Sequence, residues 1–404
     1  MTQTTSLPPV FDPFSEEFFN DPYELYRRMR DEAPVSFNER YGFWALFRYE
    51  DVALAHREWQ TFSSAHGVDL STLSKPPDLI KMLNSMIMLD PPEHDRLRAL
   101  VSRVFTPRAV AALEPMVHEV IGGFLDECDG DGFDVVLDFS GPFPVEVISR
   151  MLGVPAPDRQ QIRHWLDVML HREPGDIDPT PEGAAAAMEA VAYFMDLVVD
   201  KRAHPGDDMI SRLVEAEVDR GDGDAIRLDD EEIAGFASLL GGAGAETVTK
   251  LVANAAVLFA RHPAEWQKVL DDPGRVPSAV EEVLRYWPPS QYQGRFSVAE
   301  STFSGVTVPA GHPTLLVTGS ATHDERAFDR PDDFDIDRPP SLAIGFGYGV
   351  HSCLGAALAR LESRVAIGEL ATRWPRYEID ESECTRVHMS NVAGYASVPL
   401  RRIA

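Results

Sequence analysis

The sequence has few cysteines and no long apolar run. Its 404 residues include three cysteines, at positions 128, 353 and 384, and no CxxC pair. This count excludes a disulfide framework, gives no spacing for a zinc site, and favours a reducing compartment, so we expect a cytoplasmic protein. No uncharged stretch is long enough to span a bilayer. The N-terminus has no basic region followed by an apolar one, so we expect no signal peptide or membrane anchor.

Positive charge is also scarce. The chain has 37 Lys and Arg against 65 Asp and Glu, which gives a formal net charge of −28. This balance argues against general binding to nucleic acid or anionic membranes. No G-x-G-x-x-G motif follows a strand, so we expect no nicotinamide or flavin site within the chain.

The pattern of apolar residues predicts a mainly α protein with a small β portion. We find no internal repeat or long linker and expect one domain over residues 1–404, with residues 1–10 as a disordered tail. The helix predicted at 229–261 has an acidic start and is weakly polar nearly all round, which is typical of a buried central helix. The other predicted helices are 15–32, 49–59, 91–105, 107–126, 142–152, 159–171, 181–202, 207–218, 263–270, 277–287 and 356–370. The predicted strands are 43–47, 293–298, 301–303 and 314–317.

A glycine-rich loop holds Cys353 just before a predicted helix. The helix N-terminus lowers the pKa of a nearby thiol, and the glycines let backbone amides approach the sulfur. Phe346 can shield that sulfur from water. A lone cysteine is more commonly a buried structural residue, but this loop indicates a thiolate suited to hold iron.

Three glycines interrupt the central helix at positions 241, 242 and 244. Each costs about 1 kcal/mol relative to alanine inside a helix, so together they cost about 3 kcal/mol. Close helix packing is one explanation. The adjacent Glu246 and Thr247 suggest another, because an acid beside a hydroxyl can relay protons.

Phe346, Gly349, Cys353 and Gly355 match the pattern F-x-x-G-x-x-x-C-x-G. On this motif the sequence resembles the cytochrome P450 family of haem-thiolate monooxygenases, and the resemblance runs from about residue 11 to residue 399. It implies the cytochrome P450 fold, with the long central helix over the haem. It also implies haem b (iron protoporphyrin IX) with Cys353 as the axial ligand of the iron. The implied reaction inserts one oxygen atom from O2 into a C–H bond.

The resemblance also assigns roles on the central helix and on the helix predicted at 277–287. Residues 243–247 match [AG]-G-x-[DE]-T, so Ala243 and Gly244 would border the oxygen groove, and Thr247 and Glu246 would be the catalytic residues that deliver protons. Glu282 and Arg285 match E-x-x-R; as an isolated surface pair they would contribute little. The resemblance instead implies a buried structural network, with Arg338 as its third member.

Basic residues in family order are expected to hold the haem propionates, which need charge-assisted donors. His94 and Arg98 match H-x-x-x-R, Arg295 lies on the first predicted strand after two prolines, and His351 precedes the cysteine by two residues. Each alone would be read as a surface charge. The full set of expected cofactor-binding residues is His94, Arg98, Ala243, Gly244, Arg295, Phe346, Gly347, His351, Cys353 and Gly355. Residues 321–324 read A-T-H-D where many bacterial members have A-N-R-D, and we expect a local structural adjustment there.

The substrate pocket is the least specified part of the site. The irregular segment 63–90 is long enough to suggest a functional loop, and its methionines are adaptable apolar side chains. If these residues are not simply core, they indicate a large apolar substrate such as a lipid, steroid or terpenoid, with Gln291, Tyr292 and Asn391 orienting a polar group. The candidate lining residues are Met82, Met86, Ile87, Leu239, Leu240, Tyr292 and Val392.

Because the chain has no nucleotide motif, we expect electrons from a ferredoxin and its NAD(P)H-dependent reductase. An acidic partner of this kind would be attracted by a basic patch, and the candidates are Arg103, Arg108, Arg360 and Arg364. Three alternatives stay open: a haem-thiolate enzyme that uses peroxide, a haem-binding sensor without turnover, and a helical protein without a cofactor. The Glu246–Thr247 pair favours the O2-dependent route.

Overall fold

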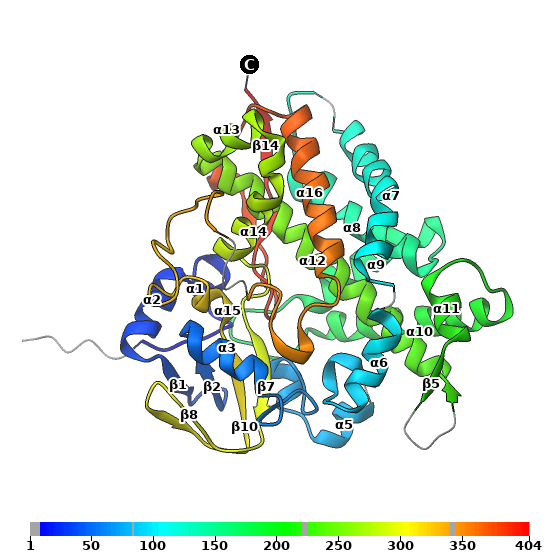
Figure 1. The fold of residues 1–404 in the computed structure, drawn as a ribbon, viewed down its shortest axis with the longest axis vertical. Helices are drawn as coiled ribbons and strands as arrows, with labels where there is room; N and C mark the ends of the chain where they lie inside the picture. Colours follow the sequence, from blue (N-terminus) through cyan, green and yellow to red (C-terminus); the bar gives the residue numbers. More distant parts are fainter. Residues whose placement is uncertain are drawn as a thin grey trace, which may run out of the picture.

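The computed structural model describes residues 9–82, 85–102, 104–128, 130–219, 225–339 and 344–403. Most of the expected tail, residues 1–8, lies outside this set. Helices dominate the described chain and the sheets are small, as the sequence predicts (Figure 1). The helices are α1 (Glu16–Asn20), α2 (Tyr23–Glu32), α3 (Tyr49–Arg57), α4 (Leu70–Leu73), α5 (Pro77–Met82), α6 (Glu93–Ser102), α7 (Pro107–Asp126), α8 (Pro142–Leu152), α9 (Arg159–Leu170), α10 (Pro181–Ala203), α11 (Met209–Glu215), α12 (Asp230–Arg261), α13 (Pro263–Asp271), α14 (Val276–Tyr286), α15 (Thr318–Ala321) and α16 (Ala356–Arg373).

The central helix α12 begins at a capping box. The Asp229 side chain accepts a hydrogen bond from the Glu232 amide at 2.8 Å, and the Glu232 side chain accepts one from the Asp229 amide at 3.0 Å. These bonds satisfy amides that have no partner inside the helix. Helix α12 runs through the middle of the molecule (Figure 1), and most of its second half is buried. The prediction of a buried central helix is confirmed.

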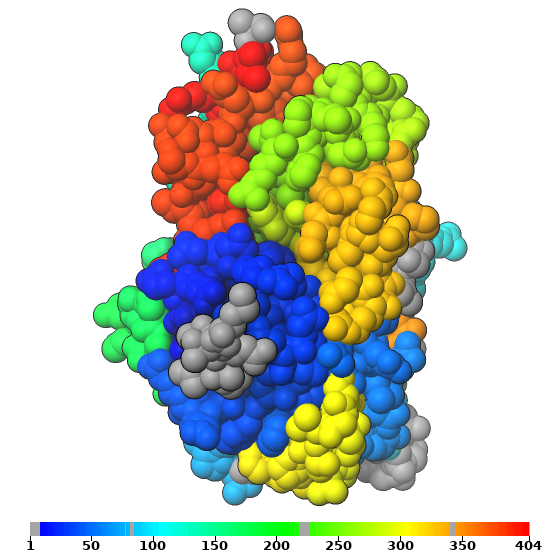
Figure 2. Space-filling model, turned by 90° about the vertical axis from the view of Figure 1, so that its left-hand side faces the viewer, coloured from blue at the N-terminus to red at the C-terminus, as the bar shows by residue number. Residues whose placement is uncertain are grey.

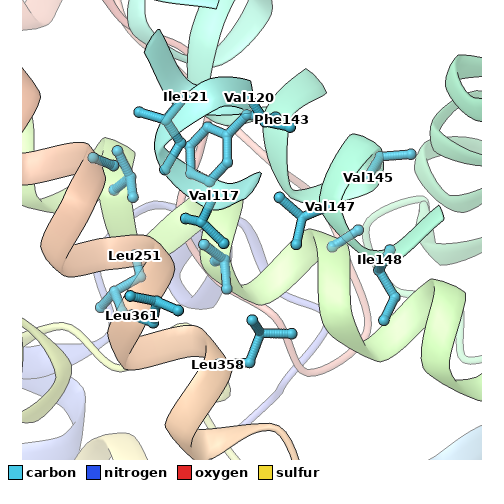
Figure 3. Packing of buried hydrophobic residues seen from close by; sticks show 14 of the residues in the cluster. Val117, Val120, Ile121, Phe143, Val145, Val147, Ile148, Leu251, Leu358 and Leu361 are labelled. Carbon is cyan, nitrogen blue, oxygen red and sulfur yellow. The ribbon is translucent and has the colours of Figure 1, made fainter. Parts of the chain in front are cut away.

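Helices α7, α8, α12 and α16 share the largest apolar core. Figure 3 shows Val117 of α7 and Phe143 of α8 on one side of this cluster, and Leu358 of α16 on the other. Burial of such side chains stabilises a fold by about 1.5–3 kcal/mol each. This packing fixes α16, and with it the loop that precedes α16.

The main sheet has five strands in the order β1-β2-β10-β7-β3. β10 pairs parallel with β2 and antiparallel with β7, and this pairing places Arg295 of β7 opposite Thr314. The strands predicted at 43–47, 293–298, 301–303 and 314–317 are found as β2, β7, β8 and β10. The strands are β1 (Val35–Asn38), β2 (Phe43–Leu46), β3 (Phe62–Ser63), β4 (Gly132–Asp134), β5 (Glu217–Asp219), β6 (Ala225–Arg227), β7 (Gln293–Ser297), β8 (Ser301–Phe303), β9 (Val306–Val308), β10 (His312–Leu316), β11 (Tyr377–Ile379), β12 (Thr385–Arg386), β13 (Tyr395–Ser397) and β14 (Pro399–Arg402).

The N-terminal helices pack against segments from the second half of the chain. Figure 2 shows the N-terminal part in blue beside the yellow and orange part near residues 300–340. Arg30 of α2 donates a hydrogen bond to the Ser320 carbonyl at 3.0 Å across this boundary. The helix predicted at 15–32 is two helices, because Pro22 has no amide proton and disfavours helical backbone at the residue before it.

The segment 63–90 is more structured than predicted. It contains α4, α5 and a short 3₁₀ turn at Met86–Met88. Asp69 caps α4 by accepting a hydrogen bond from the Thr72 amide at 3.0 Å. Residues 83 and 84 lie outside the described chain.

Candidate active site

The loop before α16 folds tightly around Cys353. The Cys353 amide donates a hydrogen bond to the Phe346 carbonyl at 2.8 Å. Gly347 and Gly349 have positive φ angles of 68° and 72°, which glycine adopts at no steric cost. A Cβ at position 349 would overlap the His56 carbonyl oxygen. The glycines are therefore required by the path of this loop against α3.

The Cys353 side chain is exposed, and nothing lies within 4 Å of the place where a Cβ on Gly355 would be. The pKa of the thiol is raised, because the surrounding protein displaces water from it. The Gly355 amide and the charges of Arg98 and Arg360 lower the pKa, but by less. The backbone amide acts in the direction predicted from the helix terminus and the glycine-rich loop, but the loss of water outweighs it, so the predicted net lowering of the pKa is not found without a bound metal. Coordination to a metal ion removes a thiol proton outright, so Cys353 would bind iron as the thiolate.

Four predicted basic residues meet beside this loop. His94 is 1% exposed, and its ring centroid lies 4.2 Å from that of His351. Arg98 donates a hydrogen bond to the Ser352 carbonyl at 2.6 Å. Burial lowers the pKa of Arg295 to about 10, and burial together with the charge of Arg295 lowers that of His351 to about 2.

A fifth basic residue, His56 of α3, was missed by sequence reasoning. It is 4% exposed, and neither ring nitrogen has a good hydrogen-bond partner in the described chain. Gln293 lies near it, but the Gln293 amide oxygen accepts from Thr318 at 2.6 Å and the amide nitrogen donates to Ser290 at 2.9 Å. Burial, and then the charge of Arg295, lower the pKa of His56 to about 3. No motif includes this histidine, so only its surroundings reveal it.

These buried groups leave hydrogen-bonding atoms without partners, although His94 pairs with Asp95 at 2.9 Å. Arg295 has Asp90 as its nearby carboxylate, and its Nη1 donates only to the Gly294 carbonyl at 2.7 Å. The Nε2 atom of His351 has no partner in the part of the chain described. Each buried polar atom without a partner costs about 1–3 kcal/mol. The set therefore fits a group with two carboxylates, as haem has.

Helix α12 presents two different faces at the predicted proton relay. Ala243 is exposed, and the Thr247 hydroxyl donates to the Ala243 carbonyl at 3.2 Å. Glu246 is buried, and its carboxylate lies 2.6 Å from the Lys250 ammonium. The structure therefore does not bring the functional groups of Glu246 and Thr247 together.

The glycines of α12 permit close helix packing, the alternative raised by the sequence. A Cβ on Gly241 would lie 3.3 Å from Phe194 of α10, and one on Gly244 would lie 3.3 Å from Ile148 of α8. Both distances are tighter than most side chains tolerate. Close packing against α10 and α8 is thus sufficient to explain Gly241 and Gly244. The expected place of Gly244 beside an oxygen groove stays a separate prediction.

The predicted ion-pair network is present behind the cysteine loop. Arg285 donates two hydrogen bonds to the Glu282 carboxylate, each at 2.8 Å, and Arg338 reaches the same carboxylate at 3.3 Å. Arg285 also donates to the carbonyls of Thr322 and Pro331. The network therefore ties α14 to the segment that leads into the loop.

The predicted substrate-lining residues do not share one environment. Tyr292 is fully buried, and its hydroxyl donates to the Ser390 carbonyl at 2.8 Å; its assignment to the pocket is wrong, because it packs against Phe11 and Phe18 in a separate core. The other candidate lining residues differ in how exposed their side chains are. Met86, Leu240 and Val392 are buried, Leu239 is half-buried, Ile87 is exposed, and the side chain of Met82 lies outside the described set.

The expected basic patch is largely neutralised. Arg360 pairs with Glu281 at 2.5 Å and lies 4.5 Å from the Phe346 ring centroid. Arg364 pairs with Glu114 at 2.7 Å. Arg108 is exposed, and Arg103 lies outside the described residues. The prediction of free positive charge here is therefore wrong for Arg360 and Arg364.

Comparisons with known proteins agree with this geometry. The cytochrome P450 family model matches residues 275–380. Cytochrome P450 123 of Mycobacterium tuberculosis is 44% identical over 393 residues, which cover 97% of this chain and 96% of the relative. The chain belongs to the cytochrome P450 family. It is thus an enzyme of the haem-thiolate monooxygenase class with the cytochrome P450 fold.

One further relative is named as a hydroxylase, and one similar solved structure is a complex with a steroid. Erythromycin C-12 hydroxylase of Saccharopolyspora erythraea is 39% identical over 371 residues, covering 90% of each chain. The structure of CYP109E1 from Bacillus megaterium in complex with testosterone matches with a TM-score of 0.86 at 34% identity, covering 96% of this chain and 99% of that one. Within the described residues, no helix combines the length and apolarity needed to cross a bilayer.

Proposed function

We propose that this P450 holds haem b through the Cys353 sulfur and inserts one oxygen atom from O2 into a C–H bond of an apolar small molecule. The observation that carries the proposal is an exposed cysteine in a glycine-rich loop, beside a buried basic cluster in which both His56 ring nitrogens and the His351 Nε2 atom have no hydrogen-bond partner in the described chain. When bound, haem supplies the activation of O2 and the transfer of oxygen. The protein supplies the sulfur ligand, the charges that hold the propionates, and proton movement.

The basic cluster that would hold the propionates divides into two groups. His94, Arg98 and His351 lie together near the start of α6 and the cysteine loop. Arg295 lies on β7 and interacts electrostatically with both His351 and His56. We assign His56 to the same function, because a carboxylate would give its unpartnered ring an acceptor.

Two residues of α12 hold and move protons. The Thr247 hydroxyl donates to the Ala243 carbonyl on an open face of the helix, and rotation of the hydroxyl would free its proton for donation on that face. Glu246 supplies a titratable group one residue away. Proton transfer by a positioned side chain contributes about 10²–10⁴-fold to rate.

The substrate class follows from the relatives and from the apolar side chains near α12. Relatives act on erythromycin or bind testosterone, which are both large and mostly apolar. We therefore propose a substrate of steroid, lipid, terpenoid or macrolide size. Ile87, Leu239 and Leu240 are the apolar candidates to contact it.

Electrons are proposed to come from a ferredoxin and its NAD(P)H-dependent reductase in the cytoplasm, because the sequence has no nucleotide motif of its own. A hollow of about 410 Å³ opens between α7, α14 and α16, beside the helix that follows Cys353. Val110, Val280 and Leu361 line it, and the Glu281–Arg360 and Glu114–Arg364 pairs flank it. With its charges balanced, this surface would bind a partner more by shape and apolar contact than by net charge.

Reconstitution tests the proposed reaction directly. Purified enzyme, a ferredoxin, its reductase and NADPH should convert a steroid or macrolide to a product carrying one oxygen atom derived from ¹⁸O2. Product from peroxide alone, with none from the O2 system, would support a peroxide-using enzyme instead. A ligand-induced change in the haem spectrum without any product, across a panel of apolar compounds, would favour the sensor.

A further inference from the structure

Arg360 of α16 makes contacts with both α14 and the cysteine loop. Its Nε atom donates to one carboxylate oxygen of Glu281 at 2.5 Å, and its Nη2 atom donates to the other at 3.1 Å. Its guanidinium carbon lies 4.5 Å from the centroid of the Phe346 ring. A guanidinium can make both contacts at once, because its edge donates to a carboxylate while its face stacks on an aromatic ring. Arg360 therefore joins a carboxylate of α14 to the ring of the cysteine loop.

The charge of Arg360 also acts on the Cys353 sulfur. Arg98 and Arg360 both favour a negative charge at this sulfur. Arg98 donates to the Ser352 carbonyl and belongs to the set that would hold the propionates. Arg360 has no such assignment, and its effect on the sulfur calls for one of its own.

The two contacts of Arg360 differ in their surroundings. The Arg360 side chain is 43% exposed and that of Glu281 is 28% exposed, so water and salt screen part of their charge. The Phe346 ring is half-buried and packs against the largest apolar core. Stacking on a ring that is held by the core restrains the guanidinium, and the guanidinium in turn covers one side of the ring.

We propose that Arg360 is a positioning residue that raises the reduction potential of the bound haem, because it restrains Phe346 and holds a positive charge near Cys353, and that Glu281 limits this effect. The inference rests on the proposed function, in which Cys353 holds haem. Arg360 acts through Phe346 and through its electric field, without touching substrate.

The direction of the effect follows from the charge balance of reduction. One electron from the reduced ferredoxin converts ferric to ferrous haem, no bond breaks, and the site becomes more negative by one unit. A nearby cation favours that change, and a carboxylate paired with the cation opposes it. An apolar cover that limits access of water also influences the potential of a metal site. Arg360 and Glu281 should therefore shift the potential in opposite directions.

Potentiometric titration of the substrate-free holoenzyme tests the proposal. In Arg360→Gln the ratio of ferrous to ferric protein at a fixed potential should fall about 3- to 10-fold, which for a one-electron couple lowers the midpoint by about 30–60 mV. In Glu281→Gln the midpoint should rise, because Arg360 keeps its charge and loses the carboxylate that offsets it. A lower midpoint in both variants would indicate general loosening of the loop and would overturn the proposal.

The neighbouring ion pair on α16 supplies a matched control. Arg364 lies one helical turn beyond Arg360, is 44% exposed, and pairs with Glu114 of α7 at 2.7 Å. It has nearly the same exposure as Arg360 but makes its pair away from the Phe346 ring. Arg364→Gln should change the ferrous to ferric ratio by less than about twofold. An equal shift in Arg360→Gln and Arg364→Gln would show that Arg360 has no special role.

A double-mutant cycle tests the part played by the ring. Phe346→Leu keeps an apolar side chain but removes the aromatic face, so Arg360→Gln should shift the midpoint less in this background than in the wild type. Equal shifts in the two backgrounds would contradict the positioning role.

The spectrum of the reduced carbon monoxide complex, recorded for each variant, separates this inference from the proposed function. A wild-type protein without the thiolate-type band would contradict the proposed function. A normal band in all variants, with the midpoint of Arg360→Gln unchanged, would contradict the role of Arg360 alone.

Discussion

His56 offers the sharpest test of how the protein holds its cofactor. Its imidazole is buried with both nitrogens lacking good partners, next to Arg295 and the glycine-rich loop. If a propionate accepts a hydrogen bond from it, His56→Phe removes a bond to a charged group, worth about 1.5–3 kcal/mol. Since 1.4 kcal/mol is a factor of ten, haem should dissociate about 10- to 100-fold faster.

Transfer of haem to excess apomyoglobin measures this dissociation rate directly. His118→Phe is the matched control, because His118 is half exposed and 3.8 Å from its nearest carboxylate on Glu369. Arg295→Gln should accelerate dissociation as well, since Arg295 lies in the same group. If Arg295→Gln accelerates haem loss and His56→Phe does not, the assignment of His56 is wrong.

Three further predictions follow from the described contacts. Glu282→Ala leaves Arg285 buried without its carboxylate and should lower the free energy of unfolding by about 3–5 kcal/mol. Glu281→Ala, at the exposed pair with Arg360, should lower it by only about 0–1 kcal/mol. Urea unfolding measures both losses, and equal losses would contradict a structural role for the network. Burial lowers the pKa of His323, so the unfolded state takes up a proton at a higher pH than the folded state does. Stability should therefore fall as pH drops below about 6.5. The urea midpoint of His323→Gln should fall less than that of the wild type between pH 7.5 and 5.5, and an equal fall in the two proteins would refute the role of His323. Thr247→Ala should lower product per NADPH and raise peroxide release while leaving substrate affinity unchanged, and an unaltered ratio of product to peroxide would remove Thr247 from the relay.

Much of the fold and the cysteine loop could be predicted from the sequence, because the signals are local. The spacing of the glycines around Cys353 determines the backbone path of the loop. The spacing of Glu282 and Arg285 places both side chains on one helix face. The weakly polar composition of α12 on nearly all its faces likewise identifies a buried central helix. The acidic residues at its N-terminus are evident in the sequence itself.

The remaining site residues depend on contacts between distant segments. His56 matters because α3 packs behind the loop at Gly349, and this contact leaves no motif. Tyr292 was wrongly placed in the pocket, since its neighbours along the chain do not reveal that it packs against the N-terminal helices. The pKa of Cys353 depends on distant segments in the same way, because desolvation by the folded protein outweighs the local helix terminus.

The absorption spectrum of the reduced carbon monoxide complex tests the central claim most directly. The account predicts a thiolate-type Soret band for the wild-type protein. It also predicts loss of that band, together with loss of substrate oxidation, in Cys353→Ser. A wild-type protein without this band, or a Cys353→Ser variant that keeps both the band and oxidation, would contradict it.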